Sequence, residues 1–349
     1  MENILRVLVV DDSAYVRKVV KQMLSRSPFV EVVSTAKDGE EALEMVEKLK
    51  PDVVTLDLIM PNMDGFEFLR AQMARRPVPV VVVSIAHEGG EQALAALDAG
   101  AVDFLQKPTA LATEKIFDIA DELISKVKAA AKVPLNRLKP MDDRAIATHR
   151  PLVMKSPQDV GVELVAIGIS TGGPVALSYL IPQLCADFPV PVAIVLHMPI
   201  GYTELYARRL NQLSQLEVLE AKEGQEVRPG LVLLAPAGQH LTFASQPGGK
   251  VVTHLSARPF DTLHRPSADV MFQSAAQVWG SRVLGVVMTG MGSDGKQGAA
   301  WIKSQGGMIL TEAESSCIVY GMPRSVVEAG LSDKVVPLDQ MAATIIDLL

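Results

Sequence analysis

The sequence predicts an α/β protein built from two doubly wound parallel-sheet domains. Short, valine-rich apolar runs alternate with longer amphipathic segments through most of the 349 residues, which is the pattern of repeated β-α-β units. In many of these runs apolar residues do not alternate with polar ones, as expected of parallel strands that are covered on both faces. The alternation is interrupted once, by a stretch with four prolines and little periodicity. We therefore expect domains over 1–128 and 161–349, joined by a linker over 129–160.

The composition suits two folded domains and argues against several functional classes. Hydrophobic residues make up 48% of the chain and charged residues 21%, which is enough for large cores. A net charge of −7 argues against a nucleic-acid binder. Cys185 and Cys317 lack metal-site spacing and suit reduced thiols in the cytoplasm. No apolar run reaches the ~18 residues of a membrane span, and no signal peptide is visible, so we expect a cytoplasmic protein without membrane insertion.

The first domain contains the elements of a five-stranded unit. Its buried strands are expected at 6–10, 53–57, 78–84 and 103–106, and its amphipathic helices at 14–26, 39–49, 91–100 and 113–132.

Acidic residues follow two of these strands. Asp11 and Asp12 end the first strand, and Asp57 ends the strand over 53–57. In a doubly wound sheet the carboxyl ends of the strands form one crevice, where three carboxylates repel one another unless a cation lies among them. Mg²⁺ prefers oxygen ligands of this kind. Asp11 and Asp12 could instead cap the following helix, but that interpretation leaves Asp57 unexplained.

Two further polar residues end strands at the same edge. Ser84 ends the next strand, and Lys107 follows the fifth. A hydroxyl and an ammonium beside a carboxylate cluster suit the binding of a phosphoryl group. The segments VLVVDDS, TLDLIMPNMDG, VVVVSIA and AGAVDFLQKP resemble the response-regulator receiver domain, whose fold is flavodoxin-like.

The resemblance to receiver domains implies a role for each matched position. Asp57 would accept a phosphoryl group from a histidine kinase. Ser84 and Lys107 would contact the phosphoryl oxygens, and Phe104 would change rotamer on activation. The implied ligands of Mg²⁺ are Asp11, Asp12, Asp57 and the main-chain carbonyl of Ile59.

The linker over 129–160 has more basic than acidic residues. One interpretation is that these charges solvate a flexible joint. The other is that they form a docking site for an acidic partner or for the second domain.

The second domain again alternates strands and helices. Strands are expected at 162–168, 191–197, 282–290 and 307–310, and helices at 173–184, 203–213, 267–279 and 295–306. Residues 231–255, with Gly248 and Gly249 between apolar runs, predict a β-hairpin appended to the sheet.

A candidate nucleophile follows the first strand of this domain. Ser170 lies in the sequence Gly-Ile-Ser-Thr-Gly, which matches the nucleophile elbow of serine hydrolases. A serine nucleophile needs a base and an orienting acid, and His197 and Asp294 also follow strands. The alternatives are that Ser170 caps a helix, that His197 is a buried structural histidine and that Asp294 is the N-cap of the next helix. His264 is the second candidate for a histidine at the site.

The order Ser, His, Asp along the chain differs from the α/β-hydrolase order. The segments IGISTGGPVAL, VLHMPIGYTELYARRL, LAPAGQHL, HRPSADVMF, MTGMGSDGKQGA and GMPRSVVEAG instead resemble the chemotaxis receptor-glutamate methylesterases (CheB-type). The resemblance implies a Rossmann-like domain with Ser170 as nucleophile, His197 as general base and then acid, and Asp294 as its orienting partner. Thr171 lies beside the nucleophile, and the N–H of Met291 would serve the oxyanion hole.

The same resemblance implies the reaction and the partners. The chain would hydrolyse γ-glutamyl methyl esters on chemoreceptors to glutamate and methanol, and deamidation of receptor glutamines uses the same chemistry. Phosphorylation of Asp57 by a chemotaxis histidine kinase would activate it, with Mg²⁺ in the receiver and no cofactor in the catalytic domain. Two rivals stay open: a phosphorylation-controlled binding module, and an esterase for small metabolites.

Overall fold

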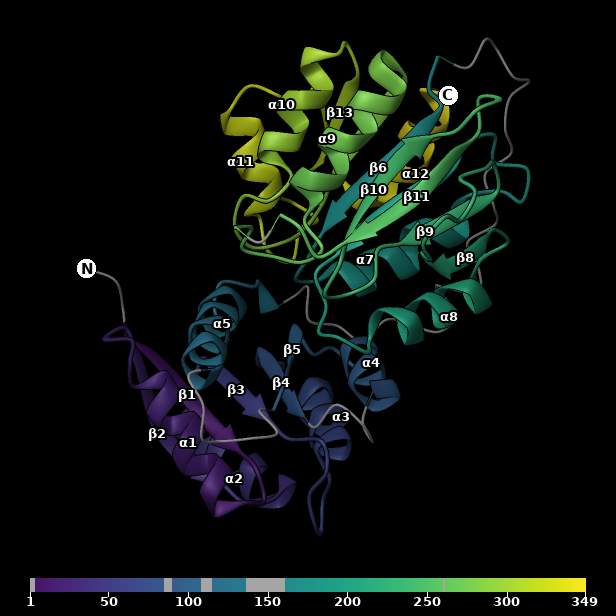
Figure 1. Cartoon of the computed structure of the whole chain (residues 1–349). Helices are drawn as coiled ribbons and strands as arrows, with labels where there is room; N and C mark the ends of the chain where they lie inside the picture. The colour runs from purple at the N-terminus through teal and green to yellow at the C-terminus, as the bar shows by residue number, and fades with distance from the viewer. Residues whose placement is uncertain (1–3, 85–89, 108–114, 136–160, 260) are drawn as a thin grey trace. The chain divides into compact units, whose positions relative to one another are not determined.

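The computed structural model describes residues 4–84, 90–107, 115–135, 161–259 and 261–349. Within these residues the chain divides into two compact units, Met1–Met141 and Asp142–Leu349, which we call unit 1 and unit 2 (Figure 1). Helix α5 continues to Ala130, two residues past the predicted end of the first domain. Most of the predicted linker, residues 136–160, lies outside the described residues, so its role stays a prediction.

Unit 1 contains a five-stranded parallel sheet in the order β2-β1-β3-β4-β5, with helices on both faces. This is the flavodoxin-like order, in which β2 is added on one side of β1 and β3 on the other, so that the strand order reverses between β1 and β3. Its strands are β1 (Leu5–Val10), β2 (Val30–Ala36), β3 (Val53–Leu56), β4 (Val80–Ser84) and β5 (Asp103–Gln106). Its helices are α1 (Ala14–Leu24), α2 (Gly39–Leu49), α3 (Gly65–Arg75), α4 (Gly90–Asp98) and α5 (Lys115–Ala130).

Strand β2 had no counterpart in the sequence prediction. Its burial pattern is mixed, and only its first and last residues, Val30 and Ala36, are buried. It lies at an edge of the sheet, so it lacks the continuous apolar run that identifies the central strands. Helix α3 begins after Asp64, which forms a reciprocal capping box with Glu67.

Unit 2 contains a seven-stranded sheet in the order β14-β13-β12-β6-β7-β9-β8, and each pair of neighbouring strands is parallel. Its strands are β6 (Leu164–Ile169), β7 (Val192–Leu196), β8 (Glu217–Glu220), β9 (Leu231–Leu234), β12 (Val283–Val287), β13 (Met308–Glu312) and β14 (Lys334–Val336). The helices are α7 (Gly173–Leu180), α8 (Thr203–Leu213), α9 (Ala268–Trp279), α10 (Lys296–Ser304), α11 (Met322–Glu328) and α12 (Leu338–Asp347), with short 3₁₀ turns at Ile181–Gln183 and Gly280–Arg282. The fold class predicted from the sequence is confirmed.

The predicted hairpin is present, but it begins later than expected. Strands β10 (His240–Ser245) and β11 (Val251–Ser256) pair antiparallel and form a two-stranded sheet of their own. Residues Leu231–Leu234, which we assigned to the hairpin, are strand β9 of the main sheet. Leu241 and Phe243 of β10 and Met271 and Phe272 of α9 belong to one hydrophobic core, so the hairpin covers α9.

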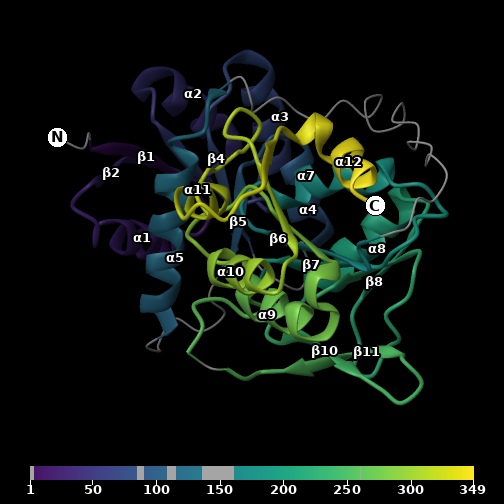
Figure 2. The ribbon, with the colours of Figure 1, turned by 90° about the horizontal axis from the view of Figure 1, so that it is seen from above.

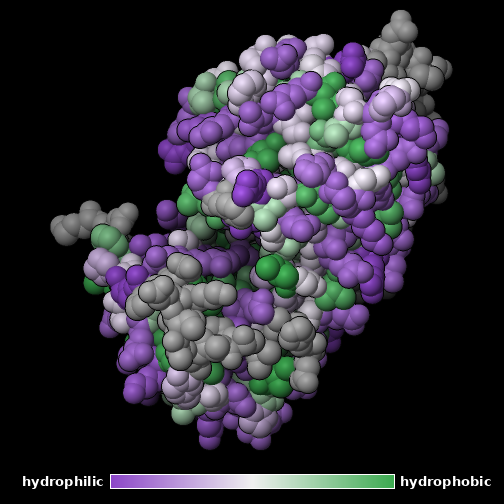
Figure 3. All heavy atoms as spheres, in the orientation of Figure 1, coloured by the Kyte–Doolittle hydropathy of each residue, from purple (hydrophilic) through white to green (hydrophobic). Residues whose placement is uncertain are grey.

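Helices cover both faces of the sheet of unit 2. Figure 2 shows α9 and α10 on one side of β6, and α7, α8 and α12 on the other. The face drawn in Figure 3 mixes hydrophilic and hydrophobic side chains. No helix of the described residues is both long enough and apolar enough to cross a membrane.

Two glycines let α9 approach its neighbours closely. A Cβ atom added to Gly168 of β6 would lie 2.7 Å from the Cβ of Ala268, the first residue of α9. A Cβ added to Gly298 of α10 would lie 2.5 Å from the Cβ of Phe272. The N-terminal half of α9 is therefore fixed between β6 and α10.

We predict that Gly168→Ala lowers the free energy of unfolding of unit 2 by about 1–3 kcal/mol, because the added methyl group overpacks the contact with α9. Gly161→Ala is the control, since a Cβ there meets nothing within 4 Å. Both tryptophans of the chain, Trp279 and Trp301, lie in unit 2, so urea unfolding followed by tryptophan fluorescence reports on this unit. Equal midpoints for the two variants would contradict the prediction.

Candidate functional sites

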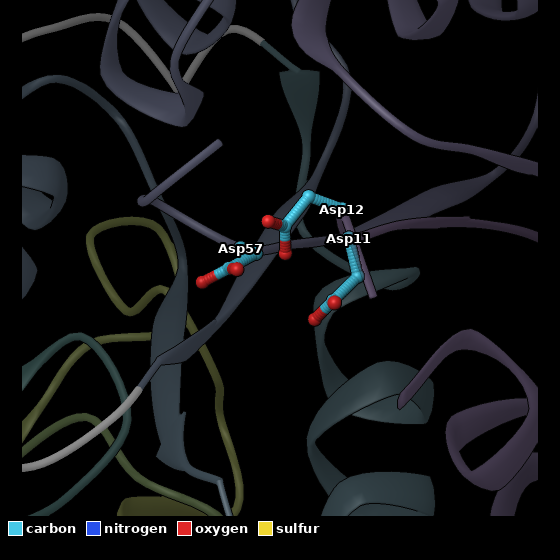
Figure 4. A group of neighbouring side chains, drawn as sticks. All are labelled: Asp11, Asp12 and Asp57. Atoms are coloured by element: carbon cyan, nitrogen blue, oxygen red, sulfur yellow. The ribbon is translucent and has the colours of Figure 1, made fainter. Parts of the chain in front are cut away.

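The three predicted acidic residues of unit 1 lie together at the carboxyl end of its sheet. Asp11 and Asp12 follow β1, and Asp57 follows β3, so they occupy the point at which the strand order reverses. One carboxylate oxygen from each lies within 4.8 Å of the others. Figure 4 shows the three side chains gathered around one point. Oxygen ligands at this spacing fit a small divalent cation such as Mg²⁺.

Lys107 joins two of these acids. Its Nζ lies 2.7 Å from Oδ2 of Asp11 and 2.6 Å from Oδ2 of Asp57. Burial raises the pKa of Asp57, although the hydrogen bond and charge of Lys107 oppose that rise. Burial would lower the pKa of Lys107, but its contacts with Asp11 and Asp57 outweigh that effect and raise it. Lys107 is therefore a buried cation that is held beside the candidate phosphoacceptor.

The other predicted residues of unit 1 surround this cluster. Ser84 ends β4, and its hydroxyl is buried without a hydrogen-bond partner among the described residues. The main-chain N–H of Ile59 acts to lower the pKa of Asp57. Phe104 lies in β5 and is buried. A buried hydroxyl with no protein partner suits a site that receives a further polar group.

In unit 2, Ser170 and His197 directly follow the adjacent strands β6 and β7, at the same end of the sheet. Ile169 pairs with Leu196 in the parallel register of β6 and β7, and the N–H of His197 donates to the carbonyl of Ile169 at 3.2 Å. Asp294 lies in the loop after β12, the strand on the other side of β6. The three residues thus follow three neighbouring strands at the reversal point of the sheet, where open α/β sheets bind ligands.

The carboxylate of Asp294 binds both His197 and the start of α9. Its Oδ2 lies 2.8 Å from Nε2 of His197. It also accepts the main-chain N–H of Ala268 at 2.7 Å and of Asp269 at 3.0 Å, and the hydroxyl of Ser267 at 2.8 Å. Sequence analysis left open that Asp294 caps the helix after it, α10. The structure shows that it caps α9 across the domain instead.

The pKa values of two carboxyl groups at this site are strongly shifted, and the two shifts have opposite directions. Burial alone would raise the pKa of Asp294, but the hydrogen bond and charge of His197 and the N–H groups of α9 hold it well below its usual range. Burial, together with the neighbouring Asp294, raises the pKa of Asp269 to about 6. Asp294 is therefore the carboxylate that stays ionised, favoured also by the N-terminus of α9.

The contact with Asp294 determines the roles of the two ring nitrogens of His197. Because Nε2 faces an ionised carboxylate, it carries the proton, and Nδ1 is the basic nitrogen. Nδ1 is buried and has no hydrogen-bond partner among the described residues. The ring of His264 stacks on that of His197, with centroids 4.1 Å apart and planes at 23°. His264, the second candidate from the sequence, therefore lies against His197 and lines the site.

The loop between β12 and α10 lies against the candidate nucleophile. A Cβ added to Gly290 would lie 2.8 Å from the Cβ of Ser170, so only glycine allows this approach. Met291 follows directly and is partly exposed. Thr171 is buried, and its carbonyl accepts the hydroxyl of Thr289 at 2.9 Å. Thr171 thus follows Ser170 directly in the sequence, and Met291 follows Gly290, which contacts Ser170.

Sequence reasoning missed two residues that support the site. Ser267 precedes α9 as an N-cap serine would, but its hydroxyl donates to Asp294. His240 is fully buried, and its Nδ1 accepts the N–H of Ser267 at 3.2 Å while Nε2 donates to the carbonyl of Pro259. A serine before an amphipathic segment was a visible signal for the helix start, but nothing in the sequence indicated its long-range partner.

Comparison with known proteins assigns both units to families. Residues 165–345 match the family described as CheB methylesterase, and residues 7–118 match the response regulator receiver domain. A Myxococcus xanthus protein named protein-glutamate methylesterase/protein-glutamine glutaminase 5 is 51% identical over 340 residues, which is 97% of this chain and 96% of that protein. A relative from Halalkalibacterium halodurans, named protein-glutamate methylesterase/protein-glutamine glutaminase, is 43% identical over 347 residues, 99% of each chain.

A solved structure also resembles unit 2. The Thermotoga maritima CheB methylesterase catalytic domain superposes with a TM-score of 0.53 and 41% identity, covering 54% of this chain and 99% of that one. The similarity in fold and sequence therefore extends over that whole domain.

We predict that Asp269→Asn flattens the pH dependence of the stability of unit 2. The folded state binds the Asp269 proton more tightly than the unfolded chain, because the pKa rises from 3.8 to about 6 on folding. The carboxyl group's contribution to the free energy of unfolding therefore falls as pH rises from about 4 to 6 and stays low above that range. Asparagine does not titrate and keeps an oxygen for the N–H of Gly298, which Asp269 accepts at 2.7 Å.

Urea unfolding, followed by tryptophan fluorescence between pH 4.5 and 7, measures this effect. The control is Asp261→Asn, which neutralises an exposed carboxyl group nearby and should keep the wild-type slope. A wild-type slope in Asp269→Asn would contradict the prediction.

Proposed function

We propose that this chain, which belongs to the CheB methylesterase family and carries a response regulator receiver domain, is a phosphorylation-activated hydrolase of γ-glutamyl methyl esters on chemoreceptors. The products are glutamate and methanol. The observation that carries the proposal is the 2.8 Å contact between His197 and Asp294, one strand away from Ser170 on each side. The relatives' names also include glutamine deamidation, which the same residues would perform with ammonia as the leaving group.

The arrangement of these side chains supports a role for each of them in ester hydrolysis. Ser170 Oγ attacks the ester carbonyl while Nδ1 of His197 takes its proton. Asp294 holds the ring through Nε2 and stabilises the imidazolium that forms. The N–H groups near Thr171 and Met291 stabilise the oxyanion, and removal of one such donor typically costs about 10²–10³ in rate. His197 then protonates the departing methoxide, and water repeats the sequence to release glutamate.

In the receiver unit, Asp57 is the proposed phosphoacceptor. Asp11, Asp12 and Asp57, with the carbonyl of Ile59, would hold Mg²⁺, which neutralises charge on the phosphoryl group. The buried hydroxyl of Ser84 and the ammonium of Lys107 would then contact its oxygens. Lys107 already lies 2.6 Å from Asp57, so phosphorylation would shift a partner that is in place.

The proposed partners are a chemotaxis histidine kinase as phosphodonor and methylated chemoreceptors as substrate. We propose that the protein acts in the cytoplasm. The buried thiols of Cys185 and Cys317 suit that reducing compartment.

We predict that Ser170→Ala reduces methanol release from a methylated chemoreceptor by at least about 10³-fold, because it removes the proposed nucleophile. The measurement uses the full chain with acetyl phosphate and Mg²⁺. Ser293→Ala, which changes an exposed serine in the loop after β12, is the matched control and should retain the wild-type rate. Release that survives in Ser170→Ala, or wild type active only on small esters, would overturn the proposal.

We predict that Asp57→Asn abolishes the stimulation by acetyl phosphate and leaves the basal rate unchanged, and that chelation of Mg²⁺ by EDTA has the same effect on wild type. The matched control is Asp52→Asn, since Asp52 precedes β3 and accepts the N–H of Arg6 at the opposite edge of the sheet. Stimulation that persists without Asp57 would contradict its role as phosphoacceptor.

A further inference from the structure

A buried carboxylate that the proposed mechanism does not use lies beneath the candidate active site. Glu312 is the last residue of β13 and is fully buried. Burial of a carboxylate is costly unless hydrogen bonds compensate it. Its Oε2 accepts the main-chain N–H of Thr289 at 2.9 Å, and its Oε1 accepts the hydroxyl of Ser316 at 2.9 Å. Each oxygen thus faces a donor, and one of those donors belongs to the loop after β12.

Thr289 connects this carboxylate to the turn of the nucleophile. Its carbonyl accepts the N–H of Ser170 at 2.9 Å. Its hydroxyl donates to the carbonyl of Thr171 at 2.9 Å and accepts the N–H of Val319 at 3.0 Å. Thr289 is itself buried, so both its main chain and its side chain hold the Ser170–Thr171 turn without competition from water.

The same residue begins the loop that approaches Ser170. Gly290 follows Thr289 and packs against the Cβ of Ser170, and Met291, the proposed oxyanion-hole residue, comes next. Any shift of Thr289 therefore moves the main chain on two sides of the nucleophile. Catalytic geometry tolerates little displacement, and a misplacement of about 1 Å can cost about 10² in rate.

We propose that Glu312 is a positioning residue for Ser170, acting through the main chain of Thr289. The inference rests on the proposed function, since it assumes that Ser170 is the nucleophile. Glu312 fixes the N–H of Thr289, and Thr289 fixes both the N–H of Ser170 and the carbonyl of Thr171. The required feature is an acceptor oxygen at this position. Glutamine should therefore substitute functionally for glutamate, whereas an apolar residue of the same length should not.

The test compares Glu312→Met, Glu312→Gln and a matched control in the full chain. The control is Thr311→Val, which removes a buried hydroxyl contact with Ser332 of 2.8 Å one residue earlier on β13. It therefore perturbs the same strand without touching Thr289. For each variant we would measure kcat and KM for methanol release, the rate at which a fluorophosphonate probe labels Ser170, and the urea midpoint by tryptophan fluorescence.

We expect Glu312→Met to lower kcat and the labelling rate by about 10- to 100-fold with KM within about twofold of wild type. Glu312→Gln and Thr311→Val should stay within about threefold of wild type in kcat, KM and the labelling rate. Equal losses in Glu312→Met and Thr311→Val would mean that strand stability alone matters, and full activity in Glu312→Met would mean that the contact is dispensable. Either result overturns the inference.

A second pair of variants tests the other half of the connection if Glu312→Met does not fold. Thr289→Val keeps the N–H on Glu312 but removes the hydroxyl that holds Thr171, whereas Thr289→Ser keeps it. We expect a loss of kcat in Thr289→Val with recovery in Thr289→Ser, and equal kcat in the two overturns the inference. A wild-type protein that neither releases methanol nor is labelled at Ser170 contradicts the proposed function instead, so the two failures are distinguishable.

Discussion

The arrangement of residues around the candidate site of unit 2 depends on one interaction, the capping of α9 by Asp294. One carboxylate satisfies two main-chain N–H groups at the start of the helix and contacts Nε2 of His197. His197 and the N-terminus of α9, which favours a negative charge, together keep Asp294 ionised. The position of α9, the orientation of the imidazole and the choice of Nδ1 as the basic nitrogen therefore have a single physical cause.

The candidate site of unit 1 also lies where strand ends converge. There several carboxylates lie together, and a buried lysine compensates their negative charge. Lys107 makes two short contacts with Asp11 and Asp57, which keeps the cluster compact. Both units thus place their candidate sites at the reversal point of a parallel sheet. We propose that one site stabilises an imidazolium and that the other receives a phosphoryl group.

Much of the fold was predictable because the central strands of both sheets are buried on both faces and read as uninterrupted valine-rich runs. Three of the four edge strands of the two parallel sheets were not predicted: β2, β8 and β14 are partly exposed, and their sequences lack that signal. The fourth edge strand, β5, is largely buried and was predicted. Strand β9 was assigned to the hairpin, since its four apolar residues fit either element. The site residues that end strands, such as Asp57 and Ser170, could be found from the local pattern and the resemblance. Ser267, Thr289 and Glu312 could not, because their partners are 27, 118 and 23 residues away in sequence and no local pattern encodes such pairs.

The close packing of α9 has a consequence for the way this domain can diverge. Gly168 of β6 and Gly298 of α10 approach Ala268 and Phe272 of α9 at distances that leave no space for a Cβ atom on either glycine. A larger side chain at either glycine would displace α9, whose N-terminus binds the carboxylate of Asp294. Selection on catalysis would therefore act on two glycines that do not contact the substrate. Among related chains these positions should therefore change in concert or remain small, and an alignment would register them as a covarying set rather than as independent sites.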